Sequence, residues 1–180
     1  MSYVIAKFRG QLPDDLLRDD AWRLRLGTVV AEVVKQETPV HPDVVFERVK
    51  DACGNPRATQ NVKTNFDAGV AQALREQGIA LGADGFLRSG DTALTTFRIG
   101  DGETLRAIEH IPEEEIAMAA IYAAQQQFGM PKEALITETA KALGYSKKPN
   151  AEGAVRISMV IDNALDRGKL RQSGNQITAL

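Results

Sequence analysis

The sequence predicts a mainly α-helical fold with small β-hairpins, arranged as two copies of one unit. Two glycines of the first copy have counterparts in the second: Gly54 corresponds to Gly144 and Gly78 to Gly168, 90 residues later in both cases. Each of these glycines follows a helical pattern, at the position where a left-handed residue commonly ends a helix. The same order of helical and extended patterns recurs in both halves, which indicates an internal duplication.

The first helix of each copy is predicted from apolar residues that recur every three or four positions, as on one side of an amphipathic helix. In the first copy these residues are Leu26, Val29, Val30, Val33 and Val34. In the second copy they are Ile116, Ala119, Ala120, Ala123 and Ala124. Pro112 and the acids at 113–115 mark a helix start, because proline fits the first helical position and carboxylates favour the positive helix end. A short extended segment follows each helix, at 38–40 and at 128–130.

The second helix of each copy is predicted to begin at a proline, Pro42 or Pro131, and to end near Cys53 or Leu143. A third helix follows with an inward apolar stripe. This stripe comprises Phe66, Val70, Ala73 and Leu74 in the first copy and Ile157, Ile161, Ala164 and Leu165 in the second. A hairpin then follows each third helix, formed by residues 79–81 and 86–87 in the first copy and by 169–171 and 177–178 in the second.

Helix, short strand, helix, helix and two-stranded wing is the order of a winged helix-turn-helix, so we predict two of these in tandem, with a generic helical bundle as the alternative. Residues 1–87 would hold an N-terminal strand, a short helix and the first winged helix. The strand is expected at 3–8 and the short helix at 14–20, with Leu16 and Leu17 inward. Residues 88–111 would form a linker, and residues 112–180 the second winged helix.

The composition excludes several classes of function. A single cysteine rules out an internal disulfide, and Cys53 is expected to pack as a small apolar residue. His41 and His110 have no cysteine or histidine at ligand spacing, so no metal site is predicted. No P-loop, nucleophile elbow or other catalytic pattern is present, so we expect no enzyme and no cofactor. Without a signal peptide or a membrane-spanning apolar stretch, the sequence predicts a cytoplasmic protein.

The charge distribution leaves room for a local nucleic-acid contact. The chain has 22 Lys and Arg against 24 Asp and Glu, a net charge of −2, which is unlike a strong nonspecific polyanion binder. The third helix is the usual major-groove reader of a winged helix-turn-helix, and its start carries suitable side chains in both copies. The candidates are Asn55, Arg57, Thr59, Gln60, Asn61, Lys63 and Thr64 in the first copy, and Lys147, Lys148, Asn150 and Arg156 in the second. A plainer interpretation is a polar helix end, with Thr59 and Asn150 acting as N-caps.

The stretch from Lys35 to Pro42, with Arg48, Gly54 and Arg57, resembles a bacterial domain of unknown function. That domain is found near the C-terminal end of large superfamily-I helicase-type proteins, often behind a nuclease-like segment. Residues 111–116 and 143–145 resemble its second block. The chain departs from the pattern at Thr38, where glycine is common, and at 147–148, where two lysines replace one basic residue. The resemblance implies a setting in DNA processing, without helicase or nuclease catalysis in these residues.

Two residues of the first block have structural interpretations as well. His41 is expected to pack against or cap the second helix. Arg48 is expected to pair with Glu47 or Asp51, or to point into solvent.

The sequence therefore yields two hypotheses of different kinds. The first is a non-catalytic, DNA-binding accessory domain of a helicase-type system, with the first copy as the contact module and the second as its support. The alternative is a protein-interaction module with a partner in a helicase or nuclease assembly. The net acidity and the small residues of the helix at 116–124 favour the alternative, because small residues allow close helix packing.

Overall fold

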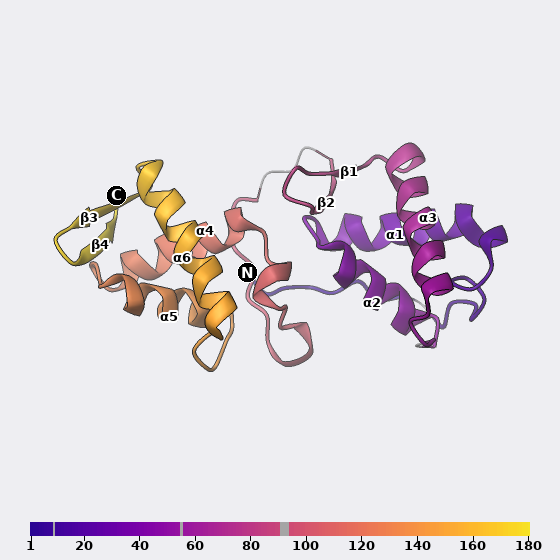
Figure 1. The fold of residues 1–180 in the computed structure, drawn as a ribbon, viewed down its shortest axis with the longest axis horizontal. Coiled ribbons are helices and arrows are strands. Elements are labelled where there is room, and N and C mark those ends of the chain that lie inside the picture. The colour runs from indigo at the N-terminus through magenta and orange to yellow at the C-terminus, as the bar shows by residue number, and fades with distance from the viewer. Residues whose placement is uncertain (9, 55, 91–93) are drawn as a thin grey trace. The chain divides into compact units, whose positions relative to one another are not determined.

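The computed structural model describes residues 1–8, 10–54, 56–90 and 94–180. The chain divides into two compact units. We call residues 4–92 the N-terminal unit, and residues 93–180 together with residues 1–3 the C-terminal unit. Both are mainly helical, and each carries a small antiparallel sheet (Figure 1). No helix among the described residues is long and apolar enough to cross a membrane.

Among the described residues of the N-terminal unit, the first regular element is a 3-10 turn at Asp20–Trp22, and three α-helices follow it. These are α1 (Arg23–Glu37), α2 (Pro42–Ala52) and α3 (Gln60–Glu76). A hairpin of β1 (Ile79–Leu81) and β2 (Leu87–Ser89) follows. Between α1 and α2 the chain forms an antiparallel bridge from Val40 to Leu87, which joins the segment before α2 to the hairpin.

The C-terminal unit has the same order of elements. It contains α4 (Glu113–Gln126), α5 (Lys132–Ala142), α6 (Ala151–Asp166), β3 (Leu170–Ser173) and β4 (Gln176–Ala179). Two 3-10 turns, Gly102–Thr104 and Ile108–His110, precede α4. The segment before α5 bridges the hairpin through Met130 and Ile177, 90 residues after the corresponding Val40 and Leu87. The expected helices and hairpins are therefore confirmed in both copies.

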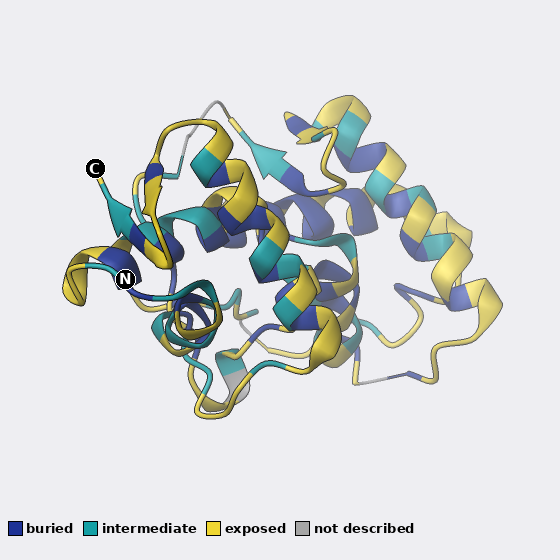
Figure 2. Ribbon diagram, turned by 60° about the vertical axis from the view of Figure 1, so that its left-hand side comes forward, coloured by how far each residue is buried: buried dark blue, intermediate teal, exposed yellow. Residues whose placement is uncertain are grey.

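Each unit has an apolar core of its own, built by the predicted stripes. Buried residues run along one side of the helices and exposed residues along the other (Figure 2). The expected left-handed glycines are also confirmed, with φ of +75° at Gly54, +106° at Gly144, +67° at Gly78 and +64° at Gly168. Cys53 is buried as expected, and burial, with the nearby Asp14 and Asp15, raises the pKa of its thiol to about 11.

A close approach between α1 and α3 depends on glycine. A Cβ atom on Gly69 of α3 would lie 2.5 Å from Cγ of Leu26 on α1, and one on Gly27 of α1 would lie 2.7 Å from Cγ of Gln72 on α3. Both distances are far inside van der Waals contact. The two glycines therefore let the helices pack closer than any larger residue would allow.

The alanine stripe of α4 is used inside the C-terminal unit. Its members, Ala119, Ala120, Ala123 and Ala124, are buried, and α4 packs against α5 and α6. The small side chains thus serve close packing within one unit. The expectation that they offer a surface to a partner or to the other module is wrong.

Two elements near the N-terminus differ from prediction. The expected strand at 3–8 is not formed; instead Ser2, just before it, makes an isolated bridge with Ile99, and the Tyr3 N–H donates to the Ile99 carbonyl at 2.8 Å. The expected helix at 14–20 is a series of turns ending in the 3-10 turn, which the Asp19 carboxylate caps by accepting the Ala21 N–H. Short aspartate side chains compete for backbone N–H groups and favour such turns. Leu16 and Leu17 are nevertheless fully buried, as expected.

Each unit buries one glutamate in a cage of hydrogen bonds. In the N-terminal unit, Oε1 of Glu37 accepts from Arg48 Nε at 3.1 Å and from the Ala6 N–H at 2.8 Å. Arg48 therefore pairs with Glu37 rather than with Glu47 or Asp51. The prediction was wrong because it considered only partners on the same helix, while Glu37 lies at the end of α1.

In the C-terminal unit the buried glutamate is Glu115, held by two arginines. Oε1 accepts from Arg98 N and from Arg106 Nη2, and Oε2 accepts from Arg98 Nη2, each at 2.7 Å. The ring of Tyr3 covers both guanidinium groups, with its centroid 5.1 Å from Cζ of Arg98 and 4.1 Å from Cζ of Arg106. The segment expected as a linker, 88–111, is divided between the two units, and its buried arginines belong to this cluster.

Candidate nucleic-acid interface

The start of α3 presents a polar surface to solvent. Thr59 caps the helix, because its hydroxyl accepts the Val62 N–H at 3.4 Å, and Val62 faces the core. The residues left on the outer side are Arg57, Gln60, Lys63 and Thr64, all exposed. Over the part of the chain that the structure describes, the side chains of these four make no ion pair and no hydrogen bond within the protein. Asn55 lies outside the described residues.

Asn61 makes a hydrogen bond within the N-terminal unit that the sequence did not predict. Its Nδ2 donates to the Arg18 carbonyl at 3.1 Å, and Asn65, one turn later, donates to the Leu17 carbonyl at 3.2 Å. These two amides fasten the segment at 13–19 to α3. Asn61 therefore makes a structural contact, and its contact with nucleic acid stays a prediction.

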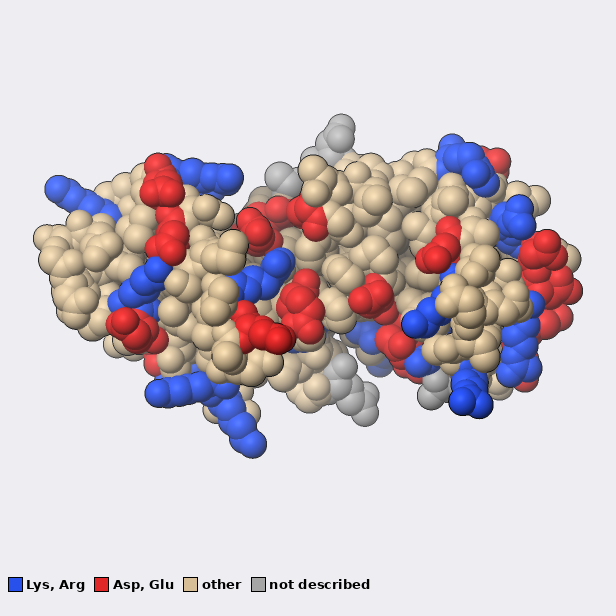
Figure 3. Space-filling model, viewed as in Figure 1, with Lys and Arg blue, Asp and Glu red and all other residues tan. Residues whose placement is uncertain are grey.

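The fastened segment brings acids near the candidate surface. Asp14, Asp15 and Asp19 are exposed residues of this segment, which lies beside the first two turns of α3. Carboxylates repel a phosphate backbone, so they restrict any nucleic-acid contact to the side of α3 that carries Gln60 and Lys63. Figure 3 shows Lys and Arg interspersed with Asp and Glu on the visible face of each unit.

In the C-terminal unit, Lys147 and Lys148 lie in the turn between α5 and α6, and both are exposed. They line a pocket of about 380 Å³ together with Tyr145, Glu109 and several apolar residues of the segment before α4. Asn150 caps α6, because Oδ1 accepts the Gly153 N–H at 2.8 Å. Its N-cap role is thus confirmed, while contact with nucleic acid is a prediction for both lysines.

Arg156 is tied to the scaffold. Its Nη2 donates to the Ile111 carbonyl at 3.1 Å, and its Nε is buried. An arginine held in this way cannot reach a groove of DNA without breaking the contact that joins α6 to the start of α4. Contact of Arg156 with nucleic acid stays a prediction, and it would require this hydrogen bond to break.

The outer face of α6 is unlike a reading helix. Val155 and Met159, one turn apart, are 59% and 60% exposed. The exposed acids of the same helix are Glu152, Asp162 and Asp166, and Asp162 Oδ1 pairs with Lys132 Nζ at 2.5 Å. This apolar and acidic face suits a protein surface better than a polyanion.

The hairpin of the C-terminal unit carries cations that the sequence analysis did not select. Arg167 and Lys169 lie in the turn between α6 and β3, and Arg171 follows the buried Leu170 in β3. All three cations are exposed. The available signal was a cation at every second position, 167, 169 and 171, at the start of the predicted hairpin.

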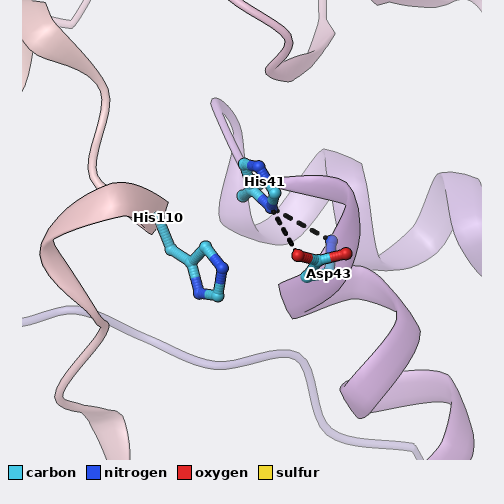
Figure 4. Close-up of side chains that lie close together, drawn as sticks. All are labelled: His41, Asp43 and His110. Carbon is cyan, nitrogen blue, oxygen red and sulfur yellow. Dashed lines mark hydrogen bonds and ion pairs between the residues drawn. The ribbon is translucent and has the colours of Figure 1, made fainter.

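His41 caps α2, as expected. Its Nδ1 accepts the Asp43 N–H at 3.2 Å and lies 3.6 Å from the Asp43 carboxylate (Figure 4). The ring also packs edge-on against Phe86, with centroids 5.4 Å apart. His110, also drawn in Figure 4, belongs to the C-terminal unit. The conformation of the block at 35–42 is thus set by the end of α1, a cap and the bridge at Val40.

Fold and site together define a helical protein with small antiparallel sheets and polar, partly basic helix and hairpin ends. Residues 15–64 match a family described as "Protein of unknown function (DUF3320)". The matched stretch runs from the turns before α1 to the first turns of α3, which is less than half of the chain. No curated protein and no solved structure matches the chain.

Proposed function

We propose that this chain is a non-catalytic, nucleic-acid-binding accessory domain made of two winged helices. The order of elements supports the fold, since helix, bridged segment, helix, helix and hairpin occur in both units. In a winged helix-turn-helix this order places the third helix in the major groove. For the N-terminal unit that helix is α3.

One observation carries the proposal: the exposed cations at the start of α3. Arg57 and Lys63 have no acidic partner among the described residues, and Gln60 lies between them. Such side chains neutralise phosphates and can reach base edges, as the sequence analysis argued for these positions.

The setting we infer is a helicase-type DNA-processing system. The match to DUF3320 falls on the same block that resembles the terminal domain of superfamily-I helicase-type proteins. That domain accompanies motor and nuclease parts, so an attached module that holds DNA would assist them. Cytoplasmic location belongs to the same proposal.

The test is DNA binding by the full chain across a salt series. Fluorescence anisotropy with duplex and forked DNA should show binding at low salt. The slope of log K against log [salt] is negative for binding to a polyanion. Its magnitude should decrease by about 2 in the double variant R57A/K63A, because each lost phosphate contact reduces it by about 0.9. The matched control is R75A on the last turn of α3, where Arg75 Nη2 donates to Gln72 Oε1 at 2.7 Å. No binding at low salt, or an unchanged slope in R57A/K63A, would refute the proposal.

A second candidate function is protein interaction, and the outer face of α6 favours it. Two apolar side chains one turn apart, Val155 and Met159, are 59% and 60% exposed, and adjoining exposed apolar side chains are typical of interaction surfaces. In a pull-down with the full chain as bait, a specific partner should be retained and should be lost with V155S/M159S. Light scattering on the same two proteins separates self-association from binding of another protein. This candidate would be contradicted if the chain is a monomer and no retained protein is lost with V155S/M159S.

A further inference from the structure

The outward face of the C-terminal hairpin consists of cations and neutral hydrogen-bonding groups. In the β3–β4 ladder, Arg171 pairs with Thr178 and Ser173 with Gln176, and these positions alternate with the buried Leu170 and Ile177. Lys169 is exposed and lies directly before β3, two positions ahead of Arg171. We call Lys169, Arg171, Ser173, Gln176 and Thr178 the wing face.

The cations of the wing face are uncompensated. Neither Lys169 nor Arg171 pairs with an acid over the described residues, and no Asp or Glu occurs in the chain after Asp166. The hairpin thus has a local positive charge in a chain whose net charge is −2. This charge pattern complements a polyanion.

The hairpin of the N-terminal unit differs at the matching position. There Ala80 pairs with Arg88, where Arg171 pairs with Thr178 in the other ladder. Arg88 is engaged by Asp84, with Nη1 to Oδ1 and Nη2 to Oδ2 both at 2.7 Å. The two hairpins share a fold. In the N-terminal hairpin the arginine is paired with an aspartate of the same turn, whereas the described residues show no such ion pair for Arg171 in the C-terminal hairpin.

We propose that the C-terminal unit binds the phosphate backbone of duplex DNA through its wing face, with α6 kept out of the groove. Lys169 and Arg171 contact phosphates, while Ser173 and Gln176 at the tip hydrogen-bond to sugar or phosphate oxygens. The exposed acids and apolar residues of α6 disfavour the helix-first orientation. This inference rests on the proposed function and gives the C-terminal unit a contact mode unlike that of the N-terminal unit.

The experiment measures binding of the full chain to duplex DNA by anisotropy, again across a salt series. Relative to the unsubstituted chain, K169A/R171A should decrease the magnitude of the slope of log K against log [salt] by about 2. The charge-retaining variant K169R/R171K should keep the slope. The matched control is K141A, which removes an exposed cation of α5 in the same unit, paired with Glu138 at 2.6 Å, and should also keep it.

Three outcomes distinguish the proposals. Binding whose slope responds to R57A/K63A but not to K169A/R171A overturns the wing contact and leaves the proposed function intact. Absence of DNA binding by the unsubstituted chain overturns both. In the third outcome, K147A/K148A decreases the magnitude of the slope by about 2, while K169A/R171A leaves it unchanged. This result would assign the phosphate contact to the turn before α6 and overturn the wing assignment.

Discussion

At the scale of single residues, Glu115 is the buried carboxylate that joins Arg98 and Arg106 in the C-terminal unit. It is fully buried and receives hydrogen bonds from two arginines that are themselves buried. Burial alone would raise the pKa of this carboxyl, but the hydrogen bonds and charges of Arg106 and Arg98 outweigh burial and hold the pKa below its usual value. Glu115 therefore stays ionised in the folded unit at neutral pH.

Replacing Glu115 by glutamine should destabilise the C-terminal unit by about 3–5 kcal/mol, because it leaves two buried guanidinium groups without a counter-charge. Urea unfolding at pH 7 measures the loss. The control is E113Q, which removes an exposed carboxylate from the same first turn of α4. A loss no larger than that of E113Q would show that the cluster contributes little.

The same residue gives a pH dependence of defined sign. A carboxyl whose pKa is lowered on folding stabilises the folded state fully above its unfolded pKa, about 4.3 for glutamate, and less as the pH falls through the folded pKa. The difference in unfolding free energy between the unsubstituted chain and E115Q should therefore shrink as the medium is acidified below about pH 4. A constant difference down to pH 2 would contradict this assignment.

At the scale of elements, the contact of α1 with α3 shows what apolar patterns reveal and what they omit. The stripes of Val29, Val33 and Phe66 predict two amphipathic helices that share a core, and they do. The short distance between the two helices depends on Gly27 and Gly69. The apolar periodicity does not predict a role for these glycines, because they carry no apolar side chain. A glycine inside a helix costs about 1 kcal/mol relative to alanine, and only the contact explains why it is there.

We expect Gly69→Ala to destabilise the N-terminal unit by about 1–2 kcal/mol, since overpacking against Leu26 exceeds the gain in helix propensity. In a Leu26→Ala background the same change should be neutral or stabilising, because the clash is with the leucine side chain. Thermal unfolding of the four proteins of this cycle measures the coupling. Equal effects of Gly69→Ala in both backgrounds would rule out the clash.

The candidate surface was less predictable than the elements. The residue types at the start of α3 are visible in the sequence, but the partner of Asn61 is a carbonyl 43 residues earlier in the chain. Likewise the role of Arg156 depends on the Ile111 carbonyl. Contacts between distant segments decide which polar side chains stay available, and periodicity does not encode them. Lys169 and Arg171 were within reach of the strand pattern.

At the scale of the whole molecule, two units with one order of elements present different surfaces. The N-terminal unit has a polar and cationic start to α3, while the C-terminal unit has an apolar and acidic α6 and a cationic hairpin. Their cores are separate clusters. A change confined to one core should therefore loosen one unit selectively.

Hydrogen exchange with mass spectrometry tests that separation in the intact chain. E115Q should accelerate amide exchange in α4, α5 and α6 and leave α1, α2 and α3 unchanged, since each helix packs within its own core. Leu26→Ala should give the reverse pattern. Acceleration of both sets of helices by either substitution would indicate one cooperative folding unit.

The place of Tyr3 in the arginine cluster has a consequence for biosynthesis. Residues 1–3 belong to the C-terminal unit, so the N-terminal unit is in effect an insertion between two parts of another domain. During translation Tyr3 is made before the N-terminal unit, whereas Arg98 and Arg106, which it covers, are made only after that unit. The inserted unit can fold first on the ribosome, while the host domain packs its later arginines against Tyr3 afterwards. An expression fragment beginning at residue 93 would therefore lack the side chain that covers both buried arginines.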